Sequence, residues 1–181
     1  EMKNVLYFPR YDVLRPNFAA IYNRINEASK DYELRTGNAL WIQKDYPLLK
    51  EYLDAVEKYY GGKAATLDFI NNPEESRQTI NKFIEEQTNH KIKELIPKGL
   101  INEFTRLVLT NAIYFKGDWK IAFNESLTKE EDFWITPKEA VKVQMMHMYP
   151  NETTLFNYAD TEEAQVLELP YVGENVSMII I

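Results

Sequence analysis

Apolar residues in the first hundred positions recur at helical spacing in three stretches. The pattern predicts helices over residues 17–30, 47–60 and 73–96. Shorter apolar runs between these helices predict strands over residues 34–43 and 64–70. Helices therefore dominate the first half of the chain, with two strands placed among them.

Two of these helices carry clear end signals. Asn72 can cap the third helix, Pro73 suits its first position, and Glu75 follows the cap by three residues as in a capping box. The second helix is predicted to begin at Pro47 and to stop at Gly61.

Beyond residue 103 the pattern changes to short strands. The predicted strands are residues 105–115, 132–135, 141–149, 153–158, 165–169 and 176–181. Helices come first and strands follow, without βαβ alternation and without an internal repeat, so the fold class is α+β.

One strand contains a polar residue on its apolar side. At the two-residue period of a strand, Asn111 shares a face with Leu107, Leu109, Ile113 and Phe115. We expect this apolar face to lie inside the protein, where an amide without partners would cost roughly 1–3 kcal/mol. Asn111 is then either a structural residue bonded to nearby backbone or a residue kept for a functional purpose.

Composition limits the class of partner. The chain has 181 residues, a formal net charge of −7, 45% hydrophobic residues and no cysteine. The negative charge and the lack of a basic cluster argue against a nucleic-acid or anionic-membrane surface. No apolar run approaches the ~18 residues of a membrane span, and disulfides, thiolate metal sites and thiol nucleophiles are excluded.

Catalytic and metal chemistry have little support. His90 is expected to face solvent at the end of a charged helix. His147 lies between Met146 and Met148, a composition that suits Cu(I), but neighbouring strand residues point to opposite faces. No nucleophile elbow and no glycine-rich phosphate loop occurs. We therefore predict no catalytic residue, no metal and no cofactor.

Three sequons mark candidate glycosylation sites. They begin at Asn124, Asn151 and Asn175. They become informative if the protein is secreted in a glycosylating organism. The chain opens at Glu1 without an initiator Met and stops at Ile181 within a predicted strand, so we expect a segment of a longer protein.

The run TNAIYFKGDW, residues 110–119, resembles the serpin family, the protease inhibitors that trap their targets by a conformational change. Phe83 departs mildly from the family, in which many members have Trp there. Other stretches agree with the family in the same order, namely residues 1–6, 32–34, 38–41, 80–81, 88, 91–92, 143–146, 167–171 and 177–181.

The resemblance implies a fold in which helices pack on a large central mixed sheet with additional barrel-like sheets. Residues 1–181 would form a single partial domain, the middle of that fold. Residues 1–103 would supply helices and two central-sheet strands, and residues 104–181 further central-sheet and barrel strands. By the same resemblance, Asn111 belongs to the shutter beneath the strands that part, and Trp119 to the breach where insertion begins.

The function implied is inhibition of a serine or cysteine protease by a suicide-substrate loop that inserts into the central sheet after cleavage. The reactive bond would lie outside this chain, in the remainder of the same polypeptide. The alternatives are a non-inhibitory carrier or chaperone and, with little support, an enzyme. Heparin is not expected to bind, because Arg24 and Lys30 are offset by Glu27 and form no basic face. An extracellular location is expected, and an intracellular one stays open.

Overall fold

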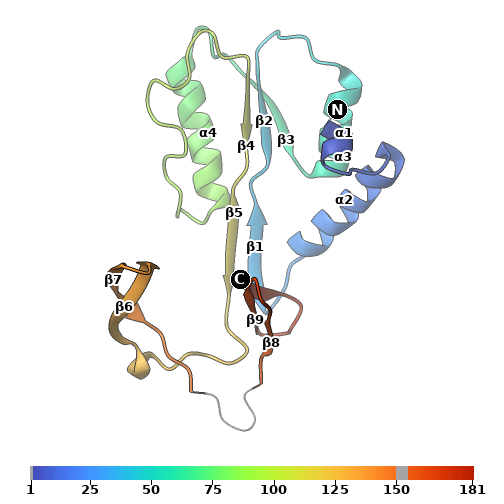
Figure 1. Ribbon diagram of the computed structural model, residues 1–181. Helices are drawn as coiled ribbons and strands as arrows, with labels where there is room; N and C mark the ends of the chain where they lie inside the picture. Colours follow the sequence, from blue (N-terminus) through green and yellow to red (C-terminus); the bar gives the residue numbers. More distant parts are fainter. Residues whose placement is uncertain (1, 150–154) are drawn as a thin grey trace. The chain divides into compact units, whose positions relative to one another are not determined.

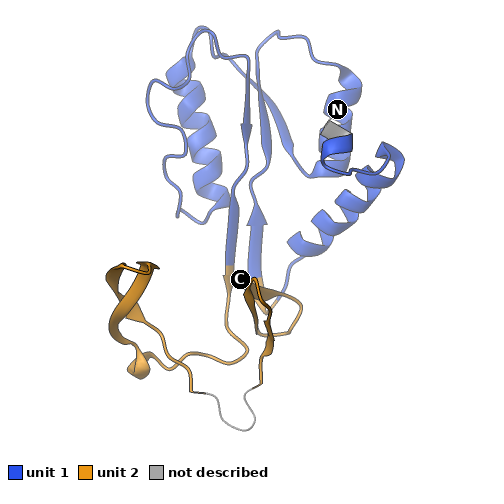
Figure 2. Ribbon diagram, in the orientation of Figure 1, with its two compact units in different colours: residues 1–29, 33–115 blue, residues 30–32, 116–181 orange. Residues whose placement is uncertain are grey.

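The computed structural model describes residues 2–149 and 155–181 (Figure 1). The chain divides into two compact units: residues 1–29 with 33–115, and residues 30–32 with 116–181 (Figure 2). The first unit contains helices α1 (Met2–Val5), α2 (Tyr11–Asn26), α3 (Lys50–Tyr60) and α4 (Pro73–Gln87), strands β2 (Ala39–Gln43), β3 (Lys63–Leu67) and β4 (Leu107–Thr110), and most of strands β1 (Tyr32–Thr36) and β5 (Ile113–Gly117). The first residue of β1 and the last two residues of β5 fall in the second unit. Helices combined with separate sheets confirm the α+β class.

The sheet of the first unit is mixed. β2 pairs in parallel with β3 and antiparallel with β4, so the strand order is β3-β2-β4. β1 and β5 pair as a separate two-stranded ladder (Figure 1). In this ladder β1 continues the line of β2 and β5 continues the line of β4, so the chain forms two long, interrupted strands (Figure 1). All five residues of β2 are buried, because helices cover both of its faces.

One face of β2 supports the apolar core beneath α4. Trp41 is 1% exposed, and its ring meets the ring of Phe83 edge to face at 5.4 Å. The Phe in place of the more usual Trp therefore still fills the space above the strand. The buried members of this cluster are Ala39, Trp41, Phe69, Ile80, Ile96 and Ile101.

The second unit is built from short antiparallel sheets. It contains the 3-10 helix η1 (Glu125–Leu127) and strands β6 (Lys129–Thr136), β7 (Glu139–Met145), β8 (Asn157–Asp160), β9 (Gln165–Pro170) and β10 (Ser177–Ile180). β6 and β7 form a hairpin, and β8, β9 and β10 form a sheet in which β9 is central. The strands expected beyond residue 103 are thus present, although the one predicted over residues 153–158 begins outside the described residues.

The observed helix ends differ in part from those predicted from the sequence pattern. α2 begins at Tyr11 rather than at residue 17, because Pro16 is accommodated inside the helix. α3 begins at Lys50 instead of Pro47, after a turn in which Asp45 takes a left-handed φ of 62°. The predicted stop at Gly61 is confirmed, since Gly61 caps α3 with a φ of 58°.

The third predicted helix differs at both ends. Asn72 precedes α4 but makes no side-chain capping hydrogen bond, although Pro73 does take the first position. α4 ends at Gln87, well before Pro97, because Asn89 and His90 adopt left-handed φ values of 50° and 59°. Residues 88–106, which we call the return segment, contain no helix or strand.

Candidate functional site

Both long strands of the first unit are interrupted at the same level. Gly37 and Asn38 separate β1 from β2, and Asn111 and Ala112 separate β4 from β5. The backbone N–H of Gly37 donates to the carbonyl of Ala112 at 2.7 Å, which bridges the two interruptions. The strands predicted over residues 34–43 and 105–115 are therefore each two strands joined by a break.

The side chain of Asn111 contributes to this break. Its Nδ2 donates to Oδ1 of Asn38 at 2.5 Å, across 73 positions of sequence. The carbonyl of Asn38 in turn accepts from the N–H of Lys63 at 3.0 Å, which ties the break to the first residue of β3. Asn38 is thus a member of the site that the sequence pattern did not single out.

The orientation expected for Asn111 is wrong for the described residues. Asn111 is exposed, and its row is exposed with it, at 69% for Leu109 and 62% for Ile113. The opposite row, which contains Thr110 and Tyr114, is the buried one. The reason is packing: α4 and the return segment cover the Thr110 face, so Asn111 incurs no burial cost here.

The buried face of the break holds two further polar contacts. Nε1 of Trp41 donates to Oγ1 of Thr110 at 3.0 Å in a fully buried bond. Nδ2 of Asn89 donates to the phenol oxygen of Tyr114 at 3.1 Å, which links the residues after α4 to β5. Thr110 and Tyr114 were not identified from sequence, although both are polar residues flanking Asn111 on the alternate face.

Gly37 shows how closely α4 approaches the break. A Cβ at this position would lie 3.0 Å from Cβ and 3.2 Å from Cγ of Gln87, the last residue of the helix. Such distances are below normal van der Waals contact, so only glycine fits without a shift of the helix end.

One edge of this strand pair is open. Within residues 2–149 and 155–181, β4 pairs with β2 and β5 pairs with β1, and neither has a second neighbour. Their remaining backbone N–H and C=O groups can therefore accept another strand.

Trp119 lies two residues beyond the end of β5, in the second unit. It forms an isolated antiparallel bridge with Tyr171, and the two rings stack at 4.4 Å with an interplanar angle of 12°. The bridge is flanked by hydrogen bonds from the N–H of Lys120 to the carbonyl of Pro170 at 3.0 Å and from the N–H of Val172 to the carbonyl of Asp118 at 2.8 Å. Strand β5 thus ends before Trp119, which is fixed by the turn between β9 and β10.

The structure describes the asparagines of two of the three sequons. Oδ1 of exposed Asn124 accepts from the N–H and the hydroxyl of Ser126, at 3.0 and 2.8 Å. Asn175 is exposed in the turn between β9 and β10. Asn151 lies outside the described residues.

The two histidines are paired with single carboxylates. His90 is exposed, as expected, and its Nδ1 lies 3.1 Å from Glu85. Nε2 of His147 lies 3.1 Å from Glu131, whose pKa is lowered mainly by a hydrogen bond from Lys129 and further by His147. In the part of the chain that the structure describes, no three metal-ligating side chains gather.

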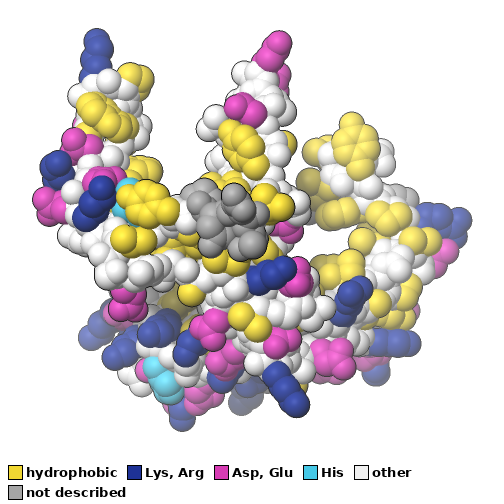
Figure 3. Space-filling model, turned by 90° about the horizontal axis from the view of Figure 1, so that it is seen from below, with side chains coloured by type: hydrophobic (Ala, Val, Ile, Leu, Met, Phe, Trp, Pro, Cys, Tyr) yellow, Lys and Arg dark blue, Asp and Glu magenta, His cyan; other side chains and the backbone are white. Residues whose placement is uncertain are grey.

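Large apolar side chains remain exposed in both units (Figure 3). They include Leu109 of β4 and Trp134 of β6, the latter 61% exposed. None of the described helices combines the length and apolar character needed to cross a bilayer.

This α+β arrangement agrees with known proteins. The family model described as Serpin (serine protease inhibitor) matches residues 1–181. The chain belongs to the serpin family, which confirms the resemblance seen in its sequence motifs.

Individual relatives agree along the chain. A serpin-like protein of Methanosarcina mazei is 47% identical over all of this chain and 42% of its own length. Human Serpin B3 is 46% identical over 91% of this chain and 42% of its own length. The leukocyte elastase inhibitor of Equus caballus is 36% identical over all of this chain and 47% of its own length.

Solved structures agree in fold. Ovalbumin from emu superimposes with a TM-score of 0.81 and 34% identity, over 92% of this chain and 43% of that one. Serpin48 of the insect Tenebrio molitor gives a TM-score of 0.80 and 28% identity, over 96% of this chain and 47% of that one. The chain therefore spans less than half the length of the relatives it matches.

Proposed function

We propose that the complete protein inhibits serine proteases as a suicide substrate. The target's serine attacks the carbonyl of a reactive bond outside this chain, forms an ester with it and releases the new amino terminus. The cleaved loop then adds as a strand beside β4 and β5 before water hydrolyses the ester. A cysteine protease would form a thioester in the same way.

The observation that carries this proposal is the match of residues 1–181 to the serpin family model, and the edge of β4 and β5, which has no second neighbour among the described residues, is where a further strand can add. An extended segment added there completes backbone ladders that are otherwise left unpaired, which favours the inserted form. Serpin loop insertion is itself a standard example of strand addition to a sheet. The family membership of residues 1–181 supports protease inhibition as the use of this edge.

Within this mechanism Asn111 acts in the shutter together with Asn38. Their hydrogen bond is exposed and joins the two interrupted strands. An exposed amide pair can exchange its partner for water or for a new neighbour at little free-energy cost, whereas packed aliphatic side chains would resist the change. Trp119 acts in the breach, where its stacking on Tyr171 fixes the segment that follows β5.

The test is incubation of the full-length protein with a panel of serine proteases, followed by denaturing electrophoresis. We expect a complex that survives detergent and has the combined mass of protease and inhibitor. Cleavage of the loop without such a complex, for every protease tested, would instead favour the alternative of a non-inhibitory carrier or chaperone. The loop sequence offers an independent discriminator, because small hinge residues permit insertion and proline or bulky charged residues oppose it.

A further inference from the structure

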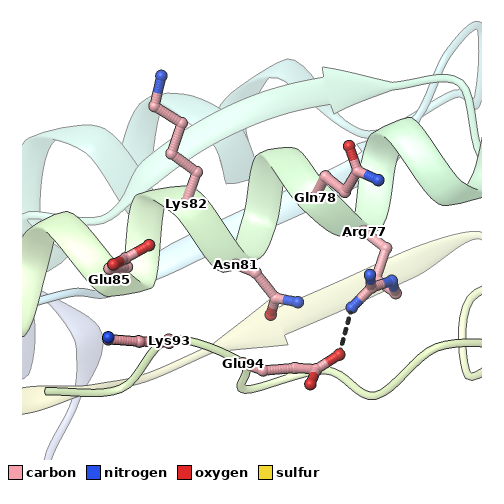
Figure 4. A pocket seen from close by; sticks show the side chains of 7 residues that line it. All are labelled: Arg77, Gln78, Asn81, Lys82, Glu85, Lys93 and Glu94. Atoms are coloured by element: carbon pink, nitrogen blue, oxygen red, sulfur yellow. Dashed lines mark hydrogen bonds and ion pairs between the residues drawn. The ribbon is translucent and has the colours of Figure 1, made fainter. Parts of the chain in front are cut away.

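The return segment, residues 88–106, is held against α4 without any regular secondary structure. It leaves the helix through the left-handed residues Asn89 and His90 and runs back beside α4 (Figure 4). At its start, Thr88 is 1% exposed, and its hydroxyl donates to the carbonyl of Ile84 at 2.8 Å and accepts from the N–H of Ile92 at 3.1 Å. Farther along, the attachment depends on side chains of α4.

Asn81 makes the central attachment. Its Nδ2 donates to the carbonyl of Ile96 at 3.0 Å, and its Oδ1 accepts from the N–H of Ile96 at 2.9 Å. One side chain, only 7% exposed, thereby satisfies both backbone groups of a buried residue. Asn81 thus replaces the ladder that a neighbouring strand would otherwise supply.

Arg77 makes a second attachment one helical turn away. Its Nη1 donates to Oε1 of Glu94 at 2.8 Å (Figure 4). The same nitrogen also donates to the carbonyl of Ile96 at 2.8 Å. Nε and Nη2 donate to the two carboxylate oxygens of Glu74 at 2.9 and 2.8 Å. The Arg77 side chain is only 12% exposed, so its position is fixed from both the helix and the return segment.

These contacts fix the backbone that carries Ile96 into the core. Ile96 is 6% exposed and belongs to the cluster that contains Trp41 and Ile80. Its release would uncover the face of the sheet that carries Trp41. An open groove of about 620 Å³, lined by Arg77, Gln78, Asn81, Lys82, Glu85, Lys93 and Glu94, borders the attachment. Water can therefore reach the polar contacts once they separate.

We propose that Arg77 and Asn81 form a releasable clasp on Ile96 and Glu94, which lets the return segment open as a local unit while α4 and the sheet stay folded. In the complete protein, the clasp limits the rate at which the sheet opens on the side covered by α4 when a strand inserts. This second role rests on the proposed function, whereas the local opening does not.

The test of local opening is hydrogen exchange by mass spectrometry on the full-length protein. In Asn81→Ala, amides of residues 88–106 should exchange roughly tenfold faster or more, as expected when a buried hydrogen-bonding side chain is removed. Glu94→Gln, which weakens only the Arg77 contact, should give a smaller acceleration in the same peptides. Amides of β2 should exchange as in the parent.

Lys82→Ala is the matched control, because Lys82 lies on the same helix and lines the groove, while its side chain points away from Lys93 and Glu94 of the return segment (Figure 4). Parent-like exchange of residues 88–106 in both test variants would overturn the clasp, and so would equal acceleration in β2. If Asn81→Ala fails to fold, Glu94→Gln decides the question alone.

The regulatory role is tested by the rate of covalent complex formation with a protease that the parent inhibits. We expect the rate to rise in Glu94→Gln and to stay unchanged in Lys82→Ala. An unchanged rate despite faster exchange would overturn the regulatory role and leave the clasp in place. A parent protein that inhibits no protease would refute the proposed function and this role with it, while the exchange result would still decide the clasp.

Discussion

Asn111 donates its side-chain amide to Oδ1 of Asn38 at 2.5 Å, from the interruption of one long strand to the interruption of the other. The contact lies at the level where the backbone of Gly37 donates to Ala112. Because Asn111 is exposed and Asn38 is only partly buried, the net contribution of such a bond to stability is about 1 kcal/mol or less. A contact of this strength can align two strands without preventing their separation.

Substitution of Asn111 should therefore change conversion kinetics more than folding. In the full-length protein, Asn111→Ala or Asn111→Leu should alter the rate of spontaneous loop insertion or polymerisation on mild heating. Asn38→Ala should have a similar effect. The double variant should resemble the single ones, since each of them removes the same hydrogen bond between Asn111 and Asn38. Native gel electrophoresis over time measures the conversion, and equal rates in parent and variants would contradict the shutter role.

The sequence pattern identified the unusual position of Asn111 but assigned its face incorrectly. Alternation predicts that Asn111 shares a row with Leu109 and Ile113, and in the structure these residues do share exposure. Which row is buried depends on α4 and the return segment, which come from elsewhere in the chain. Asn38 was missed for the same reason, because its proximity to Asn111 arises only from antiparallel pairing of distant strands.

Helix stops were predictable where one residue determines them. Gly61 takes a left-handed φ and ends α3, as its type indicates. The predicted third helix extended too far, because Ile92 and Leu95 continue the apolar spacing. In the structure, the chain reverses direction at Asn89 and His90. The attachment of Ile96 to Asn81 replaces helical hydrogen bonds, and side-chain pairing of that kind leaves no periodic signal in sequence.

The buried bond from Trp41 to Thr110 gives a stability prediction. Thr110→Val keeps the shape of the side chain but leaves the indole N–H of Trp41 without its acceptor. The expected loss is about 1–3 kcal/mol, the cost of an unpaired buried donor. Thr110→Ser retains the hydroxyl and serves as the control. Urea unfolding followed by Trp fluorescence would measure both, and a Val variant as stable as the Ser variant would contradict the role of this bond.

Alanine substitutions at two glycines would distinguish backbone strain from steric overlap as causes of lost stability. Gly61 and Gly99 have φ values of 58° and 83°, so alanine is strained at either position by roughly 1–2 kcal/mol. A Cβ on Gly61 would also overlap the ring of Tyr22, whereas nothing lies within 4 Å of a Cβ on Gly99. Gly61→Ala should therefore lower the unfolding midpoint clearly more than Gly99→Ala. Equal losses would show that α2 does not pack on the end of α3 as described.

Glu74 predicts a pH dependence of stability. Hydrogen bonds from Arg77, and then from Gln78, lower the pKa of Glu74 from its ordinary 4.5 to about 2. The folded state thus binds this proton more weakly than the unfolded chain, so protonation favours unfolding. The contribution is complete above about pH 4.5 and is lost as the pH falls toward 2. Glu74→Gln should make unfolding midpoints less dependent on pH across this window, whereas Lys82→Ala should leave the parent slope unchanged.

The stack of Trp119 on Tyr171 predicts a change that is local to the second unit. Tyr171→Leu removes an aromatic partner at 4.4 Å and should cost about 0.5–1.5 kcal/mol beyond the lost area, while the flanking backbone bonds of Lys120 and Val172 remain. Tyr171→Phe keeps the ring and should therefore keep the stack, so it is the control for loss of the aromatic contact. Because the stack fixes the indole, near-ultraviolet circular dichroism should weaken in the Leu variant alone.

The same pair of variants tests whether Trp119 acts in the breach. If the stacked ring holds the segment after β5 in place until a strand inserts, Tyr171→Leu should raise the rate of spontaneous conversion in the full-length protein, and Tyr171→Phe should not. A Leu variant that loses the dichroism signal but converts at the parent rate would leave the stack as a packing contact with no part in insertion. Measuring dichroism and conversion on one preparation distinguishes these outcomes, because the first reports the contact itself and the second its consequence.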